Sequence, residues 1–123
     1  MFSEKFIEVL KHEGVVSIVS IAENEAHVVN TWNRYLEIAD GNKLLIPAAA
    51  MIKTEKNVKL NSRVKLTLGS KEVMGYKSMG TGFLLEGTAK FLKEGEHYDM
   101  MLKKCPFLTR VLEVTVDSCK QTL

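Results

Sequence analysis

The chain has 123 residues, of which 46% are hydrophobic and 26% are charged, and these proportions are typical of one globular domain. Its 17 basic and 15 acidic residues give a net charge of +2 and are interspersed, which argues against a nucleic acid or an anionic membrane as partner. The N-terminus lacks an uninterrupted hydrophobic region, and no segment is long and apolar enough to span a bilayer. We therefore expect one cytoplasmic domain over residues 1–123, with no nucleic-acid and no membrane partner.

The first predicted element is a short helix that covers one end of the fold. Ser3 is a natural N-cap, and Phe2 and Ile7 occupy the positions of a hydrophobic staple. Gly14 is expected to end the helix. The apolar stripe of the helix consists of Phe6, Ile7 and Leu10.

Alternating or apolar runs predict six strands after this helix. They are Val15–Ile21, Ala26–Trp32 with a continuation to Ile38, Lys43–Pro47, Arg63–Leu68, Gly82–Leu92 and Val111–Asp117. Turns are expected at Glu23–Glu25, Asp40–Asn42, Gly69–Ser70 and Gly75–Gly80. A second substantial helix is expected over Glu96–Lys104, before Pro106. Strands spaced this closely, with few and short helices, indicate a mostly β protein built as a small antiparallel barrel rather than a parallel α/β sheet.

The stretch Leu44–Val58, LLIPAAAMIKTEKNV, runs from an apolar strand through small residues into a short helix. Its three alanines allow a ligand to approach the backbone closely, Lys53 supplies a cation, and Thr54 can act as helix N-cap and hydroxyl donor. This combination predicts a phosphate cradle. The stretch lacks the glycine spacing of a P-loop or Rossmann motif, so a plain strand-to-helix connection with a solvated lysine stays as the alternative.

Four segments, in this order along the chain, resemble one known family. They are VVNTWN at Val28–Asn33, IPAAAMIKTEKN at Ile46–Asn57, GTGFLLEGTAKF at Gly80–Phe91 and QTL at Gln121–Leu123. The chain thereby resembles the FMN-binding split-barrel family that includes pyridoxamine 5'-phosphate oxidase, and within it the small bacterial FMN-binding proteins. The resemblance implies an antiparallel split β-barrel, a homodimer, and noncovalently bound FMN at the subunit interface.

The resemblance also assigns residues to the phosphate of FMN. Lys53 falls on the family's phosphate-binding basic residue, and Thr54 follows it. Asn30 lies where larger members carry an arginine that also grips the phosphate. The asparagine removes one charge, so we expect this site to rely more on neutral donors and backbone N–H groups. A strand asparagine satisfied by the backbone is the alternative for Asn30.

Further residues are assigned to the flavin ring. Thr31 and Trp32 map to the strand that edges the isoalloxazine ring, with a role as core aromatic equally open for Trp32. Tyr35 and Phe107 are aromatic candidates near the ring, for which core packing is the favoured role. The ring and the ribityl chain are expected to be walled by Pro47, Ala48, Ala49, Ala50 and Met51.

Three more residues are assigned to the subunit interface. Thr81 and Gly82 open the strand that runs beside the cofactor in the family, with relief of backbone strain at a turn as the alternative for Gly80 and Gly82. Leu123 is expected to reach the flavin of the other subunit, with a frayed tail as the alternative.

No group of residues predicts metal or nucleophilic catalysis. The three histidines are scattered along the chain, and Cys105 and Cys119 form no CxxC motif. The expected function is therefore redox chemistry carried by the flavin, either in an oxidoreductase such as a flavin reductase or in an electron carrier with a redox partner. The resemblance disfavours vitamin B6 oxidation, because this short chain largely lacks the substrate-binding segments of the larger oxidases.

Two other functions stay open at this point. A non-redox barrel of the OB type could bind an oligonucleotide or another anion through Trp32, Tyr35, Tyr76, Lys43, Lys53, Lys71 and Lys77. A haem-binding split barrel would need an axial ligand, for which His27 is the candidate. An absorbance spectrum of the purified protein separates flavin, haem and neither.

Overall fold

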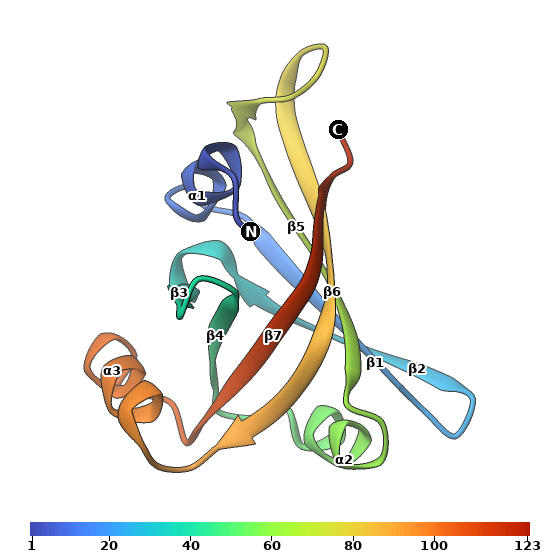
Figure 1. Ribbon diagram of the computed structural model, residues 1–123, viewed down its shortest axis with the longest axis vertical. Helices are drawn as coiled ribbons and strands as arrows, with labels where there is room; N and C mark the ends of the chain where they lie inside the picture. The colour runs from blue at the N-terminus through green and yellow to red at the C-terminus, as the bar shows by residue number, and fades with distance from the viewer.

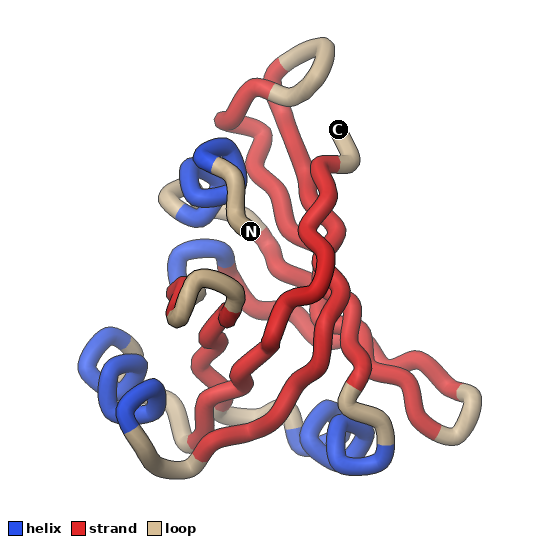
Figure 2. Tube along the Cα trace, viewed as in Figure 1, coloured by secondary structure: helices blue, strands red, loops and turns tan.

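Seven antiparallel strands form one strongly curved sheet in the computed structural model of residues 1–123, in the order β2-β1-β5-β6-β7-β4-β3 (Figure 1). The strands are β1 (Val15–Ala22), β2 (Glu25–Trp32), β3 (Glu37–Ala39), β4 (Lys43–Ala48), β5 (Arg63–Met74), β6 (Met79–Leu92) and β7 (Arg110–Gln121). The helices are α1 (Glu4–Leu10), α2 (Ile52–Leu60) and α3 (Glu96–Lys104), with a 3-10 turn η1 at Asn33–Tyr35. Strands dominate the chain, and the helices lie separately around the sheet (Figure 2). The prediction of a mostly β, antiparallel, barrel-like fold with a few short helices is confirmed.

The main core lies inside the curve of the sheet. Alternate residues of the strands are buried there, among them Val64, Leu66 and Leu68 of β5. α1 covers one end of this core, where the rings of Phe6 and Phe83 meet edge to face at 5.3 Å. β4 and β7 also contribute to a second, smaller cluster with α3, so these two strands are buried on both faces.

α1 begins as predicted but packs differently. Ser3 caps the helix, because its Oγ accepts a hydrogen bond from the Phe6 N–H at 3.1 Å. The predicted staple between Phe2 and Ile7 is wrong: Phe2 stacks on Phe6 with 4.9 Å between ring centroids, and Ile7 is 39% exposed. Val9 takes the place of Ile7 on the buried face, three residues after Phe6 on the same side of the helix.

Several predicted strand ends are wrong. β6 begins at Met79 rather than Gly82, and β7 runs to Gln121 rather than Asp117. The second strand does not continue to Ile38, because the chain leaves it after Trp32 to form η1. The turn predicted at Gly69–Ser70 lies inside β5, where both residues pair with β6. A Cβ on Gly69 would stand 2.5 Å from the carbonyl oxygen of Thr81. The glycine therefore permits a close approach of two strands rather than a turn.

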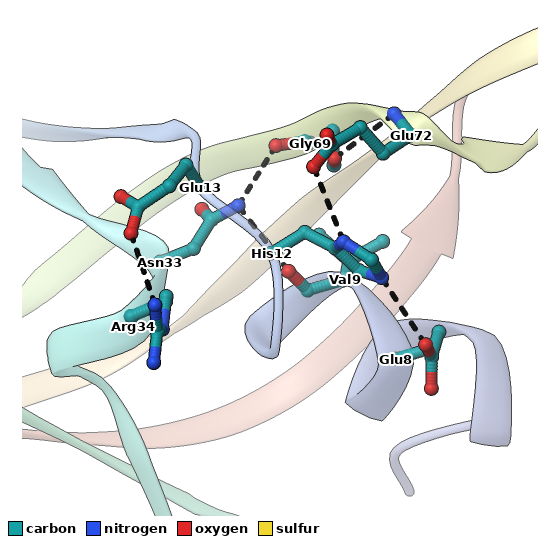
Figure 3. Close-up of polar contacts among 9 residues, drawn as sticks. Glu8, Val9, His12, Glu13, Asn33, Arg34, Gly69 and Glu72 are labelled. Atoms are coloured by element: carbon teal, nitrogen blue, oxygen red, sulfur yellow. Dashed lines mark hydrogen bonds and ion pairs between the residues drawn. The ribbon is translucent and has the colours of Figure 1, made fainter.

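Asn33 lies fully buried where α1, β5 and η1 meet (Figure 3). Its backbone N–H donates to the carbonyl of Gly14 at 2.9 Å. Its Nδ2 donates to the carbonyls of Gly69 at 2.9 Å and Val9 at 3.4 Å. Gly14 does not end α1, which stops at Leu10; a Cβ on Gly14 would overlap the Gly69 carbonyl and the Asn33 amide. The requirement for glycine at position 14 is thus one of space.

Exposed ion pairs surround this crossing. Arg34 contacts Glu13 at 3.3 Å, and His12 lies between Glu8 at 3.1 Å and Glu72 at 3.2 Å (Figure 3). Pairs at the surface contribute little to stability, because water screens them and ordering the side chains costs entropy. The buried amide of Asn33 is therefore the stronger restraint at this place.

A buried carboxylate joins α3 to the sheet. Glu113 of β7 is 3% exposed, and its carboxylate lies 2.7 Å from Nδ1 of His97, 3.6 Å from Nζ of Lys43 and 3.8 Å from Nζ of Lys90. Burial by itself raises the pKa of Glu113, but the His97 hydrogen bond and the charges of Lys43, Lys90 and His97 outweigh it and hold the pKa below its ordinary value of 4.5. The ionised form is thus favoured in the folded protein.

Replacing Gly14 by alanine should lower the free energy of unfolding by about 1–3 kcal/mol, because the new methyl group must displace a backbone carbonyl. Urea denaturation followed by circular dichroism measures the loss. The control is Gly41→Ala, which adds a Cβ to open space at a φ of +79° and should cost only about 1 kcal/mol of backbone strain. An unchanged urea midpoint for Gly14→Ala would contradict the packing described for Asn33.

The ionised Glu113 should stabilise the fold fully above pH 4.5, and this stabilisation should disappear as the pH falls through the lower folded-state pKa. Glu113→Gln should therefore lower stability at pH 7 by about 1–3 kcal/mol and flatten the decline below about pH 5. Urea denaturation between pH 7 and pH 3 tests this. Glu86→Gln, which removes a partly exposed pair with Lys65, is the control. Parallel pH profiles for wild type and Glu113→Gln would refute the claim.

Candidate functional site

A small hollow of about 270 Å³ lies between β2, η1, the end of β4 and the segment that follows α3. Seven of the predicted site residues line it, namely Asn30, Thr31, Trp32, Pro47, Ala49, Ala50 and Met51. Val29, Tyr35 and Phe107 complete its lining. The structure thus brings together two chain segments that the sequence analysis had assigned to one ligand.

Aromatic side chains form the rim of the small hollow. Trp32 is 48% exposed, so the alternative of a core aromatic is wrong for this residue. Tyr35 and Phe107 are also exposed, and their ring centroids lie 5.3 Å apart at a tilt of 51°. The expectation of core packing is therefore wrong for both, because η1 turns Tyr35 outward against the segment after α3.

Asn30 is held by the neighbouring strand. Its Nδ2 donates to the Ser17 Oγ at 3.2 Å and to the Val16 carbonyl at 3.4 Å, both in β1. These bonds occupy the amide nitrogen, as in the alternative of a strand asparagine satisfied by the backbone. The residue nevertheless lines the small hollow.

The N-terminus of α2 has several donors without a partner. The helix begins at Ile52 after Met51, whose φ of +60° is left-handed and whose side chain makes no capping bond. Thr54 was expected to be the N-cap of this helix. It is instead the third residue of the helix. It is fully buried, and its Oγ1 has no hydrogen-bond partner. Lys53 is exposed and forms no ion pair.

The unpaired donors extend backward along the chain from α2. The six backbone N–H groups of residues 49–54 have no hydrogen-bond partner, and the first bond of the helix runs from the Glu55 N–H to the Met51 carbonyl at 2.9 Å. Consecutive free N–H groups at a helix N-terminus favour an anion through their partial positive charge. This run, with Lys53 and Thr54, can hold a phosphate beside the small hollow.

The carbonyls of the same loop are bound by two residues that the sequence analysis missed. The Thr109 Oγ1, which has one proton to donate, lies 3.2 Å from the carbonyl oxygen of Ala48 and 3.3 Å from that of Ala49. The Arg110 Nη2 donates to the carbonyl of Ala50. The one signal in the sequence is an arginine directly before the predicted strand Val111–Asp117, which by itself indicates no contact with a loop sixty residues earlier.

Four predicted residues lie elsewhere. Ala48, the last residue of β4, is fully buried and does not line the small hollow. Thr81, Gly82 and Leu123 line a separate, larger hollow of about 970 Å³ beside the β5–β6 hairpin. Leu123 is fixed there, because its carbonyl accepts a hydrogen bond from the Thr81 Oγ1 at 2.8 Å and the Thr122 N–H donates to the Gly82 carbonyl at 2.8 Å. The alternative of a frayed tail is wrong. Within one chain, these residues do not reach the small hollow.

Other kinds of chemistry find few groups in the structure. No cluster of three or more histidine, cysteine, aspartate and glutamate side chains is arranged to hold a metal ion. Both cysteines are free, and burial raises the pKa of each thiol, that of Cys119 to about 11. Neither thiol is a ready nucleophile at neutral pH. No helix has both the length and the apolar surface needed to cross a bilayer.

Two solved structures share this fold. HupZ of Group A Streptococcus has a TM-score of 0.81 at 14% sequence identity, and the match covers 98% of this chain and 94% of that one. An FMN-binding protein of Syntrophomonas wolfei subsp. wolfei has a TM-score of 0.69 at 14% identity, covering 88% of this chain and 76% of that one. At such low identity, the likeness concerns the fold.

Comparison of sequences gives the family. The family model described as pyridoxamine 5'-phosphate oxidase matches residues 2–122. An FMN-binding protein of Nitratidesulfovibrio vulgaris (strain DSM 19637 / Miyazaki F) is 44% identical over 123 residues, which are 100% of both chains. With matches over nearly its whole length, the chain belongs to the pyridoxamine 5'-phosphate oxidase family and has the antiparallel split-barrel fold that its sequence predicts.

Proposed function

We propose that the protein binds FMN noncovalently and acts in electron transfer or flavin-dependent oxidoreduction. The observation that carries the proposal is the run of unpaired donors at residues 49–54 beside an apolar hollow with an aromatic rim. The relative that is 44% identical is named an FMN-binding protein, which supports the same ligand. A phosphate attached to a flat aromatic ring satisfies both parts of this arrangement.

The buried hydroxyl of Thr54, which has no hydrogen-bond partner, supports the fit of these residues to a phosphate. A buried polar atom without a partner costs free energy unless a ligand or water satisfies it. In the proposed complex, the phosphate accepts from the Thr54 hydroxyl, from Lys53, and from the N–H groups of residues 52–54. Asn30 supplies no charge, so the phosphate is bound by the neutral donors and by one lysine.

The small hollow suits the flavin ring but does not enclose it. Its volume of about 270 Å³ is below the range of about 300–1,000 Å³ that is usual for ligand pockets. We propose that a second copy of the chain closes the site and that its large hollow, with Thr81, Gly82 and Leu123, covers the ring. The separation of the two groups of predicted residues within one chain supports such a homodimer.

The lining of the small hollow contains no histidine, cysteine, aspartate or glutamate. When bound, the flavin supplies one-electron or hydride chemistry. The side chains bind the phosphate, orient the ring against Trp32 and Tyr35, and exclude water from its face. This arrangement fits an electron carrier or an oxidoreductase of the flavin reductase type, with an unidentified redox partner.

The alternatives find less support. The aromatic residues proposed for an oligonucleotide lie in two different hollows, with Trp32 and Tyr35 in the small one and Tyr76 in the large one. The ammonium of Lys43 pairs with the Glu113 carboxylate at 3.6 Å, which leaves it less able to bind a ligand. His27, the candidate haem ligand, lines neither hollow.

Apoprotein should take up one FMN per chain and sediment as a dimer at micromolar concentration, because each site needs surface from both copies. Isothermal titration with FMN, FAD and riboflavin gives the affinities, and analytical ultracentrifugation gives the mass. Titration with a short oligonucleotide and with haemin serves as the control for the alternatives. Failure to bind FMN, or preference for FAD, would overturn the ligand; a monomeric holoprotein would overturn the shared site.

Lys53→Ala should weaken FMN binding while leaving riboflavin binding nearly unchanged, because riboflavin lacks the phosphate. The loss of a charge-assisted hydrogen bond costs about 1.5–3 kcal/mol, or roughly tenfold to 150-fold in dissociation constant. The matched control is Lys56→Ala, another exposed lysine of α2. Equal losses for both ligands would place Lys53 at the ring, and unchanged FMN affinity would place the phosphate elsewhere.

A further inference from the structure

The three carbonyls of the alanine loop, residues 48–50, are all bound from one side. The Thr109 backbone N–H donates to the Ala48 carbonyl at 2.9 Å, which leaves the single hydroxyl proton of Thr109 for the Ala49 carbonyl at 3.3 Å. Arg110 takes the third, that of Ala50, through Nη2. Three consecutive carbonyls in a loop thus have fixed directions, although a loop of small residues has little side-chain packing to hold it.

Fixing a carbonyl also fixes the next N–H group. All peptide bonds of the chain are trans, and in a planar trans peptide the C=O and N–H bonds point in opposite directions. The N–H groups of Ala49, Ala50 and Met51 therefore point away from Thr109 and Arg110. These are the first three of the six unpaired N–H groups, and all three residues line the small hollow.

Arg110 is anchored well enough to serve as such a support. It is 8% exposed, its Nε contacts the Glu55 carboxylate of α2 at 2.8 Å, and its guanidinium lies 5.2 Å from the centre of the Phe91 ring. One side chain therefore joins the loop carbonyl of Ala50 to the first turns of α2. This side chain, together with the backbone bond from the Glu55 N–H to the Met51 carbonyl, sets the position of the ring wall relative to the helix N-terminus.

We propose that Thr109 and Arg110 are positioning residues for the flavin: Thr109 orients the N–H groups that face the ring, and Arg110 sets the spacing between the ring wall and the phosphate-binding end of α2. The proposal rests on the proposed binding of FMN. Neither side chain lines the small hollow, so both act through the loop.

The two residues should therefore have different effects on two ligands. Thr109→Val should weaken FMN and riboflavin equally, about tenfold, since the ring edge is common to both. Arg110→Met should weaken FMN about tenfold more than riboflavin, since the phosphate donors move relative to the ring. Thr109→Ser should restore wild-type binding. Arg110→Lys should not, because an ammonium cannot bond the Ala50 carbonyl and the Glu55 carboxylate in the same fork.

Hydrogen exchange of the unliganded full-length protein gives a readout that is independent of ligand. The amides of residues 49–54 should exchange faster in Thr109→Val and Arg110→Met than in wild type, while those of β1 and β5 stay unchanged. The control is Arg63→Met, which removes another arginine–carboxylate pair, with Asp117, on the opposite end of β7. It should change neither exchange in the loop nor ligand binding.

The outcomes separate the two proposals. If wild-type apoprotein binds neither FMN nor riboflavin, the proposed function fails. If the wild type binds both and Arg110→Met shows the same ratio of the two affinities, the positioning role of Arg110 fails. If Thr109→Ser binds the ligands as weakly as Thr109→Val, the inference is overturned. It is also overturned if the loop amides of the two variants exchange faster only in proportion to a loss of overall stability, because Thr109 and Arg110 would then be merely structural.

Discussion

The buried amide of Asn33 is the interaction on which the geometry of the small hollow depends. Its Nδ2 joins α1 to β5 through bonds to the carbonyls of Val9 and Gly69, and the backbone N–H of Asn33 adds a bond to the Gly14 carbonyl. The Oδ1 has no partner. Because η1 starts at this residue, the direction in which the chain leaves β2 is fixed here. Trp32 precedes Asn33 directly and Tyr35 follows it by two residues, so the positions of two of the three rim aromatics depend on one buried polar residue.

β7 organises the other side of the molecule. Thr109 directly before the strand and Arg110 at its start hold the alanine loop. Glu113 in its middle joins α3 to the sheet, and Gln121 at its end leads to the fixed Leu123. Since β7 pairs with both β4 and β6, a shift in its register would disturb the alanine loop and the large hollow together. The two halves of the proposed flavin site are thus linked through one strand.

Local patterns predicted most of the architecture, and long-range contacts account for what they missed. Alternation in β5 and the Ser3 cap depend on near neighbours, and both were predicted correctly. Gly69 and Gly14 were interpreted as turn or helix-end signals, because a sequence does not show that another backbone approaches within contact distance. Likewise, the loop residues of the site were expected from their small size and their lysine, whereas the dependence of that loop on Arg110 arises only when the chain is folded.

The missing cap of α2 has a consequence for how the protein holds together. The Met51 side chain makes no capping hydrogen bond to the free N–H groups, and the left-handed backbone of Met51 is itself slightly unfavourable. In the proposed complex the phosphate would serve as the cap, so the ligand would complete a secondary-structure element as well as carry electrons. Stability would then follow cofactor supply by mass action, and a cell short of flavin would contain a less stable population of the same chain.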